Sequence, residues 1–415
     1  MTAQQQLVAA RPPAARPPAA PPRRRRHRIR RVMRSRVFRV IAAVLLVLLI
    51  WTSWSIGQAL TAPGTDSAAS RLAEWARDHR LGWVVTDLER IQYWLNPPMT
   101  GGTPSGGIPS MNDPAARPGG GTAPTTPHAA VQVHAHLPAP AVVRVIAGAP
   151  LANEGRWQTV GEVAGLPAVR VAYVRPDNVH TSYLVGVMWL DPKLLIARLH
   201  PGTTDPGGTW PEPSLIPPQW RATAMAGINS GFRLGDASRG GYYAHGRLVS
   251  PLRDHAASVV VYKNGTATVG AWGRDVTLGP QVVAVRQNLD LLIDGGGLNP
   301  TCATDSAGEW GATLGNKAYV ARSGLGITKT GALIYVGGPA MSVCTLGQVM
   351  LAAGVTRGME LDINPGWIRG AYYAHDGATV TPHRLIDFSD VEPPPPPDRL
   401  FNISTRDFFA FYARQ

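Results

Sequence analysis

The hydrophobic residues of this chain form one long run near the N-terminus and many short runs after residue 140. The long run, residues 40–60, contains no charged residue, and as a helix it would extend ~30 Å, the thickness of the hydrocarbon core of a bilayer. Trp51 and Trp54 lie toward its far end, where aromatic side chains favour the membrane interface. This run predicts a transmembrane helix. A cleaved signal peptide is the alternative, although the segment before the run is long and no Ala-x-Ala follows it.

The short runs alternate with Gly, Pro, Asn and Asp, which is typical of strands joined by turns. They predict a sheet-rich α+β domain with few helices over residues 131–415. Helix is expected only at residues 192–197 and at 342–354, where Thr345 could cap the helix and Gly354 could end it. The expected strands are residues 142–146, 169–174, 182–190, 258–262, 267–269, 282–285, 289–293 and 333–336.

Two further segments connect the long run to this domain. Residues 61–96 carry apolar positions at helical spacing, which predicts a juxtamembrane helical segment with a packing role. Residues 97–130 are rich in Pro, Gly, Thr and Ser, which predicts a linker. Near the C-terminus, the five prolines at 393–397 predict a stiff polyproline segment, and the aromatic-rich residues 399–415 are expected to pack back on the domain.

Charge is concentrated at the N-terminus. Residues 1–39 contain 12 Arg and no Lys, Asp or Glu, whereas the rest of the chain has 28 basic and 27 acidic residues. The first segment is predicted to be a disordered cytoplasmic tail, because positive charge stays inside and its Arg/Pro-rich composition cannot bury a core. The domain then lies outside the plasma membrane. A nearly neutral domain argues against nucleic-acid binding, which usually requires a basic face.

The chain has two cysteines, Cys302 and Cys344. Outside the cytoplasm such a pair usually forms a disulfide, and closing a loop of this length contributes ~3–4 kcal/mol in the chain-entropy model. Two separated thiols supply too few ligands for a zinc site. We therefore predict a disulfide, with buried free thiols as the alternative.

The densest candidate chemistry lies between residues 321 and 373. Arg322 and Ser323 stand at the start of one expected strand, and Asp362 stands at the end of another, beside the turn that begins at Asn364. A guanidinium group binds phosphate through two hydrogen bonds, so these residues predict a sugar-phosphate site. The alternatives are that Arg322 pairs with a structural carboxylate and that Asp362 caps its own turn. Glu360 lies two residues before Asp362, too far along the strand to be paired with it as a catalytic carboxylate.

These motifs resemble the catalytic half of the phosphodiester glycosidase family. The family pattern is Arg-Thr-x-x-Gly, a Thr-x-x-Gly-x-Leu hairpin, a helix and then Leu-Asp-Gly-Gly-Gly-Ser. Arg322, Gly326 and Asp362 stand at the matching positions, whereas residues 363–366 replace the glycine-rich turn and its serine. The resemblance covers roughly residues 140–390. It implies hydrolysis of a sugar 1-phosphodiester, with a phosphoglycan or cell-wall polysaccharide as substrate. The altered turn motivates the rival expectation of a non-catalytic glycan-binding or envelope scaffold domain.

The resemblance extends more weakly to the first half of the domain. Asn229 and Gly231 resemble the family's Asn-Gly-x-Phe segment, and His245 resembles its Asp/His-Gly hairpin. Asn229 would bind sugar hydroxyls, and glycine N–H groups would approach a phosphate. In the alternative reading these residues only support turns. Asp294 precedes three glycines in an expected ligand loop, for which an ordinary turn is the alternative.

The implied reaction requires an anchored phosphate, a carboxylate near the anomeric carbon and protonation of the leaving oxygen. We assign Arg322 to the phosphate, Asp362 to the carboxylate and His245 to the proton. Ser323 and Asn364 are expected to contribute to substrate binding. A divalent cation near the acidic turns is compatible with the sequence, but no ligand set can be written, and the sequence does not indicate an oligomeric state.

Overall fold

The computed structural model describes residues 36–110, 135–235, 237–304, 309–311, 318–368, 370–386 and 396–415. Most of the predicted tail, residues 111–130 of the predicted linker and the prolines at 393–395 lie outside these residues. The chain divides into two compact units, Met1–Thr61 and Ala62–Gln415. The predicted helical segment after residue 61 therefore belongs to the same unit as the sheets.

In the first unit, the apolar run forms one helix, α2 (Arg36–Thr61). Its 26 residues have a window of mean hydropathy 2.2, and none of that window is buried in protein. The helix is long and apolar enough to cross a membrane. A signal sequence near the N-terminus would meet the same criterion, and the helix alone does not determine its orientation.

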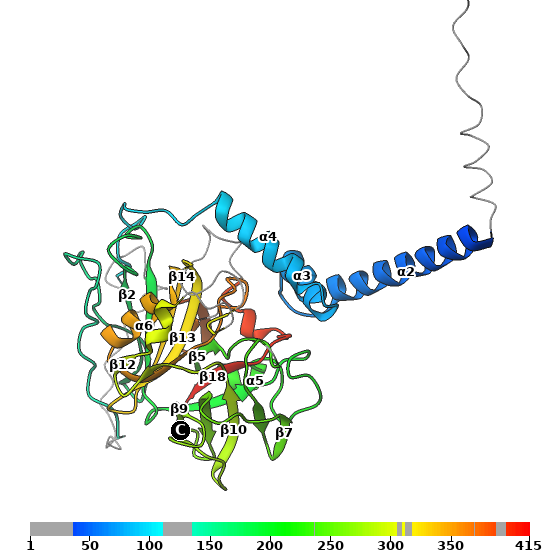
Figure 1. Ribbon diagram of the computed structural model, residues 1–415. Helices are drawn as coiled ribbons and strands as arrows, with labels where there is room; N and C mark the ends of the chain where they lie inside the picture. Colours follow the sequence, from blue (N-terminus) through cyan, green and yellow to red (C-terminus); the bar gives the residue numbers. More distant parts are fainter. Residues whose placement is uncertain are drawn as a thin grey trace, which may run out of the picture. The chain divides into compact units, whose positions relative to one another are not determined.

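Residues 61–96 form two helices, α3 (Ala68–Asp78) and α4 (Gly82–Leu95) (Figure 1). Ser67 begins α3, because its hydroxyl accepts a hydrogen bond from the N–H of Ser70 at 3.1 Å. The helices separate at Arg80, whose φ of 61° is incompatible with a continuous right-handed helix. An ion pair of 2.9 Å between Arg77 and Glu89 joins the two helices.

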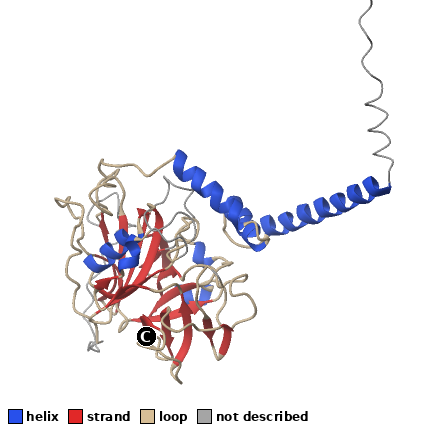
Figure 2. Cartoon of the chain, viewed as in Figure 1, coloured by secondary structure: helices blue, strands red, loops and turns tan. Residues whose placement is uncertain are grey.

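The largest sheet has the strand order β1-β2-β3-β14-β13-β15-β11-β12, and each neighbouring pair is antiparallel. Figure 2 shows how strands predominate in this unit. The eight strands are β1 (Gln158–Val163), β2 (Leu166–Val174), β3 (Val185–Leu190), β11 (Leu291–Asp294), β12 (Gly297–Leu298), β13 (Val320–Thr328), β14 (Leu333–Met341) and β15 (Val355–Glu360).

Two five-stranded antiparallel sheets complete the domain, with the orders β7-β6-β10-β8-β9 and β17-β16-β5-β18-β4. The predicted sheet-rich α+β fold is confirmed. The remaining elements are β4 (Leu195–His200), α5 (Pro218–Arg221), β5 (Ala224–Asn229), β6 (Tyr242–Ala244), β7 (Arg247–Ser250), β8 (Ala257–Tyr262), β9 (Ala267–Ala271), β10 (Val282–Gln287), η1 (Pro300–Ala303), α6 (Val343–Ala352), β16 (Gly370–Asp376), β17 (Thr379–Arg384), η2 (Arg399–Phe401) and β18 (Phe408–Ala413).

The alternation of side chains in the large sheet builds two cores. In β3, Val187 and Trp189 pack in the core that contains α6, whereas Met188 and Leu190 point into a second core shared with the other two sheets. Period-two side-chain direction explains the split, because successive residues of a strand face opposite sides. Both faces are covered, so the strand is apolar throughout.

Helix α6 confirms the helix predicted at 342–354, but Ser342 rather than Thr345 is its N-cap. Gly354 follows the C-cap with a φ of 88°, as expected for a helix stop. The helix predicted at 192–197 is wrong. Residues 195–200 form β4, which pairs with β18, because Leu195, Ala197 and Leu199 pack in the shared core. Residues 142–146 form no strand, although Val143 is buried.

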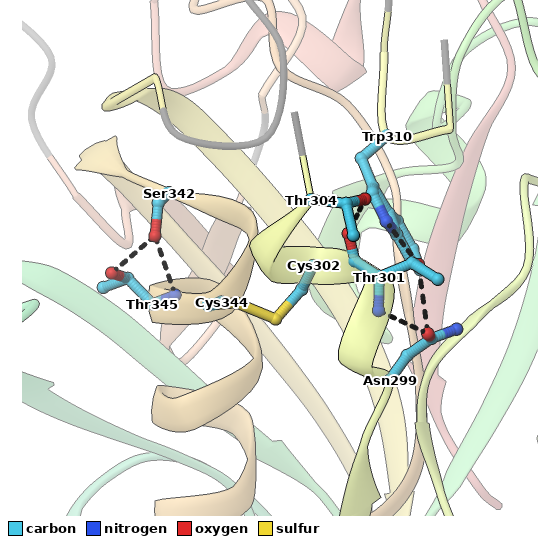
Figure 3. Close-up of a disulfide and its surroundings, with 8 residues drawn as sticks. All are labelled: Asn299, Thr301, Cys302, Thr304, Trp310, Ser342, Cys344 and Thr345. Carbon is cyan, nitrogen blue, oxygen red and sulfur yellow. Dashed lines mark hydrogen bonds between the residues drawn. A yellow bond between two sulfur atoms is a disulfide. The ribbon is translucent and has the colours of Figure 1, made fainter. Parts of the chain in front are cut away.

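The predicted disulfide joins Cys302 in η1 to Cys344 in α6, with a Cα–Cα distance of 5.1 Å (Figure 3). Asn299 caps η1 by accepting the N–H of Thr301 at 3.1 Å, and the Thr301 hydroxyl accepts a hydrogen bond from the indole N–H of Trp310. The bridge therefore fastens the chain around η1 to the helix that covers the large sheet.

Candidate functional site

A small cavity lies where strand ends from two sheets converge. Asn229 is the last residue of β5 and pairs with Phe408 at the start of β18, while Asp362 follows the end of β15. The space that water can occupy in the cavity is about 10 Å³, which is room for about one molecule. It is lined by Asn229, Gly231, Asp362, Trp367, Arg399, Leu400, Ser404, Arg406, Asp407 and Phe408.

Asp362 is a buried carboxylate at this cavity, with 3% of its surface exposed. Its Oδ1 accepts the N–H groups of Ile363 and Asn364 at 2.8 and 3.0 Å, and its Oδ2 lies 3.5 Å from Arg406. Burial raises the pKa of Asp362, although the Arg406 guanidinium and the two N–H groups oppose that rise. Asp362 therefore does cap its own turn, which is the alternative role predicted from the sequence. Its second oxygen, Oδ2, lies beside the guanidinium of Arg406.

Asn229 connects the cavity to the large sheet. Its side-chain N–H₂ donates to the Ser323 hydroxyl at 3.0 Å, and its Oδ1 accepts the Tyr335 hydroxyl proton at 2.8 Å. The Ser323 hydroxyl in turn accepts the N–H of Asp362 at 3.3 Å. Because both groups on the Asn229 amide have fixed partners, its orientation is set before any ligand arrives. Ser323 lies behind the cavity wall and supports both Asn229 and Asp362.

Arg322 does not line the cavity. Its guanidinium donates to Glu360 at 2.5 Å and to the carbonyl of Met341 at 2.8 Å, and both ionic side chains are at least 99% buried. Burial raises the pKa of Glu360, and Arg322 opposes that rise. Strand pairing explains the contact, because β13 pairs with β15 and the N–H of Leu361, directly after β15, donates to the carbonyl of Ser323 in β13 at 2.8 Å. The geometry matches the alternative role, a structural ion pair; the phosphate-binding role remains a prediction.

Six of the residues that line the cavity come from the C-terminal segment: Arg399, Leu400, Ser404, Arg406, Asp407 and Phe408. The guanidinium groups of Arg399 and Arg406 lie over the ring of Trp367, at 4.8 and 4.9 Å from its centroid. Arg406 also donates to the carbonyl of Gly231 at 3.0 Å. A cation over an aromatic face is attracted by the ring quadrupole, so Trp367 holds both arginines at the cavity.

Asp407 is a second buried carboxyl at the cavity. Its Oδ2 accepts a hydrogen bond from Nε of Arg286 at 2.8 Å, and its Oδ1 has no hydrogen-bond partner within the described part of the chain. Burial raises the pKa of Asp407, and Arg286 opposes the rise. The two oxygens therefore differ: Oδ2 is held by a guanidinium, whereas Oδ1 is buried without a donor of its own among the described residues.

The other predicted site residues occupy different places. Gly231 lines the cavity, and a Cβ there would approach the Asn288 side chain to 3.1 Å. Asn364 does not line the cavity itself, but its carbonyl accepts the N–H of Trp367, which does, at 2.8 Å. His245 and Asp294 do not line the cavity: the first pairs with Glu212 beyond β6, and the second forms an exposed pair with Arg274 at 2.7 Å.

Seven of the ten residues that line the cavity were not among the candidates from the sequence: Trp367, Arg399, Leu400, Ser404, Arg406, Asp407 and Phe408. The available signal was the charged pair Arg406-Asp407 directly before the apolar run that forms β18. That run was expected to pack on the domain, and it does so between β5 and β4. A charged pair at the start of a central strand is expensive to bury without partners, which makes it a reasonable site candidate.

Among the described residues, no group of three or more His, Cys, Asp or Glu side chains is arranged to hold a metal ion. The divalent cation considered from the sequence therefore has no ligand set that can be named.

No family model matches this chain, and no curated protein sequence matches it. Solved structures with a distant likeness of fold include the auto-inhibited, pro-peptide-bearing catalytic domain of zebrafish N-acetylglucosamine-1-phosphodiester alpha-N-acetylglucosaminidase. It shares 13% identity, 63% of this chain and 88% of that chain are covered, and the TM-score is 0.39. A hypothetical protein from Synechocystis shares 11% identity over 60% of this chain and 63% of that chain, with a TM-score of 0.32.

Proposed function

We propose that this protein is a membrane-anchored, extracytoplasmic hydrolase of sugar 1-phosphodiester linkages, acting on cell-envelope or exopolysaccharide glycans. The observation that carries the proposal is the pair of buried carboxyls, Asp362 and Asp407, that line one cavity together with Asn229 and two arginines. Enzymes that cleave glycosidic bonds usually use two carboxyl groups in different surroundings, one protonated and one ionised. The resemblance of the Arg322–Asp362 motifs to phosphodiester glycosidases supplies the substrate class.

In this proposal Asp362 is the ionised carboxylate beside the anomeric carbon. Positive charge develops on that carbon as the bond to the phosphate oxygen breaks, and a nearby carboxylate stabilises it. Arg406, 3.5 Å from Oδ2, favours the ionised form. Asn229 is fixed by Ser323 and Tyr335, and it contributes polar contacts to the sugar hydroxyls.

Asp407 takes the proton-donor role that the sequence analysis gave to His245, because it lines the cavity and His245 does not. Its Oδ1 carries the proton while Oδ2 accepts the hydrogen bond from Arg286. In the overall reaction the C1–O bond breaks, the departing phosphate oxygen receives a proton, and water supplies the hydroxyl on the sugar. The products are a free sugar and a phosphomonoester.

A non-catalytic glycan-binding domain is the second candidate. The motivating observation is the altered turn at residues 363–366, where Asn364 supports Trp367 in place of the family's glycines and serine. Both candidates predict affinity for glycans, so only turnover separates them.

The experiment that tests the function is hydrolysis of a panel of sugar 1-phosphodiesters, including cell-wall glycan fragments, by the full chain in detergent micelles. We expect release of reducing sugar and of the phosphomonoester. Because burial raises the pKa of Asp407, its protonated form should persist above the ordinary carboxyl range, and the rate should fall as pH rises through that raised pKa. Binding of a glycan with no hydrolysis of any panel member would favour the scaffold candidate.

The proposed location rests on α2 and on the 12 arginines that precede residue 40. The positive-inside rule places those arginines in the cytoplasm and residues 61–415 outside. Protease treatment of intact cells should remove the C-terminal domain and leave an N-terminal fragment of about the length of tail plus span. Protection of the whole chain, or a mature chain that lacks α2, would contradict this topology.

A further inference from the structure

One side of helix α4 is covered with exposed apolar side chains. Five large apolar residues of this helix are 54% to 80% exposed: Trp83, Leu88, Ile91, Trp94 and Leu95. At 3.6 residues per turn they fall within an arc of about 140° on one side of the helix. We call these five residues the tryptophan face. A contiguous exposed apolar surface usually marks an interaction site, whereas single exposed apolar residues are normal.

The opposite side of α4 is the one that contacts the rest of the domain. Glu89 pairs with Arg77 of α3 at 2.9 Å, and the Tyr93 hydroxyl accepts a hydrogen bond from the backbone N–H of Tyr319 at 3.2 Å. On the helix, Glu89 and Tyr93 lie about half a turn from the centre of the tryptophan face. These contacts therefore fix α4 with its tryptophan face directed away from them.

The covalent connection to α2 limits what this face can meet. The second unit begins at Ala62, directly after α2, and only residues 62–81 separate the end of α2 from the start of α4. Because 11 of these residues form α3, the connection spans at most ~50 Å. With α2 as the proposed membrane anchor, α4 is held near the bilayer surface on the same side as the domain.

The charged residues near this face suit a lipid headgroup region better than a dry protein interface. Asp87 lies within the arc and Arg90 beside it, and the two form an exposed ion pair at 3.2 Å. Removing such a pair from water between two protein surfaces is costly. The headgroup region stays hydrated, and its phosphates attract a guanidinium. Tryptophan is also enriched at this depth of a bilayer.

We propose that the tryptophan face of α4 lies in the headgroup region of the bilayer that α2 spans, with the helix axis in the plane of the membrane. A helix with Trp and Leu on one face and charged residues on the other binds membrane interfaces in this way, at a depth of ~5–10 Å. The domain then has two attachments to the membrane, a spanning helix and an interfacial helix. This inference rests on the proposed membrane anchor and not on the proposed hydrolase activity.

Site-directed spin labelling of the full chain in phosphatidylcholine vesicles tests this placement. Cys302 and Cys344 are joined in the disulfide, so a single introduced cysteine carries the label. Ile91→Cys places the label near the centre of the tryptophan face, and Gln92→Cys places it at the next exposed position, about 100° around the helix. We expect the ratio of oxygen to nickel-complex collision rates to be several times higher at residue 91, because oxygen concentrates among acyl chains and the nickel complex stays in water.

A label in the middle of α2, introduced by Leu48→Cys, is the control for the anchor. We expect it to show the highest ratio of the three positions. A deep label at residue 48 together with equal ratios at residues 91 and 92 would overturn the interfacial placement and leave the anchor intact. A label at residue 48 in water would remove the anchor and this inference with it. Neither result depends on turnover, so the hydrolase proposal is tested independently.

Replacing Trp83 and Trp94 with serine in the Ile91→Cys protein provides a second measurement. The ratio at residue 91 should fall toward that at residue 92, because the two largest apolar groups of the face are lost. Both tryptophans are exposed, so the melting temperature of the domain should not change. An unchanged ratio would contradict the role of the tryptophan face. Shielding of the label at residue 91 from both reagents, with dipolar broadening by a neighbouring label, would assign the face to a second copy of the chain and overturn the proposal.

Discussion

Replacing Asp362 with asparagine is expected to lower turnover of a sugar 1-phosphodiester by about 100-fold or more, with little change in KM. The carboxylate would stabilise charge that develops only toward the transition state, so its loss affects kcat more than ground-state binding. Asparagine is the appropriate replacement because its Oδ1 can still accept the N–H groups of Ile363 and Asn364. The fold around the cavity should therefore persist, and steady-state kinetics will report the lost charge.

The control for this prediction is the same substitution at Asp294, which lies outside the cavity in an exposed pair with Arg274. Asp294→Asn should retain the unmodified rate. Both variants must first melt near the temperature of the unmodified protein. A well-folded Asp362→Asn protein with the unmodified rate would show that the site assignment is wrong. A slow Asp294→Asn protein would instead support the ligand-loop role that the sequence predicts for Asp294.

Replacing Arg322 with methionine is expected to destabilise the domain by about 3–5 kcal/mol, the usual cost of removing one partner from a buried ion pair. Glu360 would then be a buried carboxylate without its guanidinium partner. The measurement is the free energy of unfolding of the full chain in detergent, by denaturant titration. In contrast, a phosphate-binding Arg322 predicts normal stability and a raised KM.

The pH dependence of that loss has a definite sign. Without Arg322, burial and the nearby Asp362 charge act unopposed on Glu360, so its folded-state pKa lies further above the unfolded value. Such a group favours the folded state below the unfolded pKa, and that contribution disappears as pH rises through the folded pKa. The destabilisation should therefore be smaller in acid. In the double variant with Glu360→Met the penalty should shrink as well, because no buried charge remains. Equal losses at all pH values would indicate that packing, rather than charge, is responsible.

Much of the local architecture follows from the sequence alone. An uncharged run of membrane-spanning length becomes α2, and a helical apolar period ending at Gly354 becomes α6. The two cysteines form the predicted bridge. Asp362 and Asn229 lie at one cavity, as strand-end polar residues in a sheet fold often do. In each of these cases the determining information is local: periodicity, turn residues, or the small number of pairing choices.

Other elements and contacts depend on the tertiary structure, because the residues that interact are far apart in the sequence. Residues 195–200 have a helix-compatible composition, yet pairing with β18 more than 200 residues later makes them a strand. Arg322 is bound to Glu360 rather than to the cavity because β13 and β15 are neighbours. The cavity's cations come from residues 399 and 406, and the anion on Arg399 comes from Asp66. A buried charged side chain is stable only beside an opposite charge. Which opposite charge lies close enough depends on how the sheets pack, and the sequence alone does not show that.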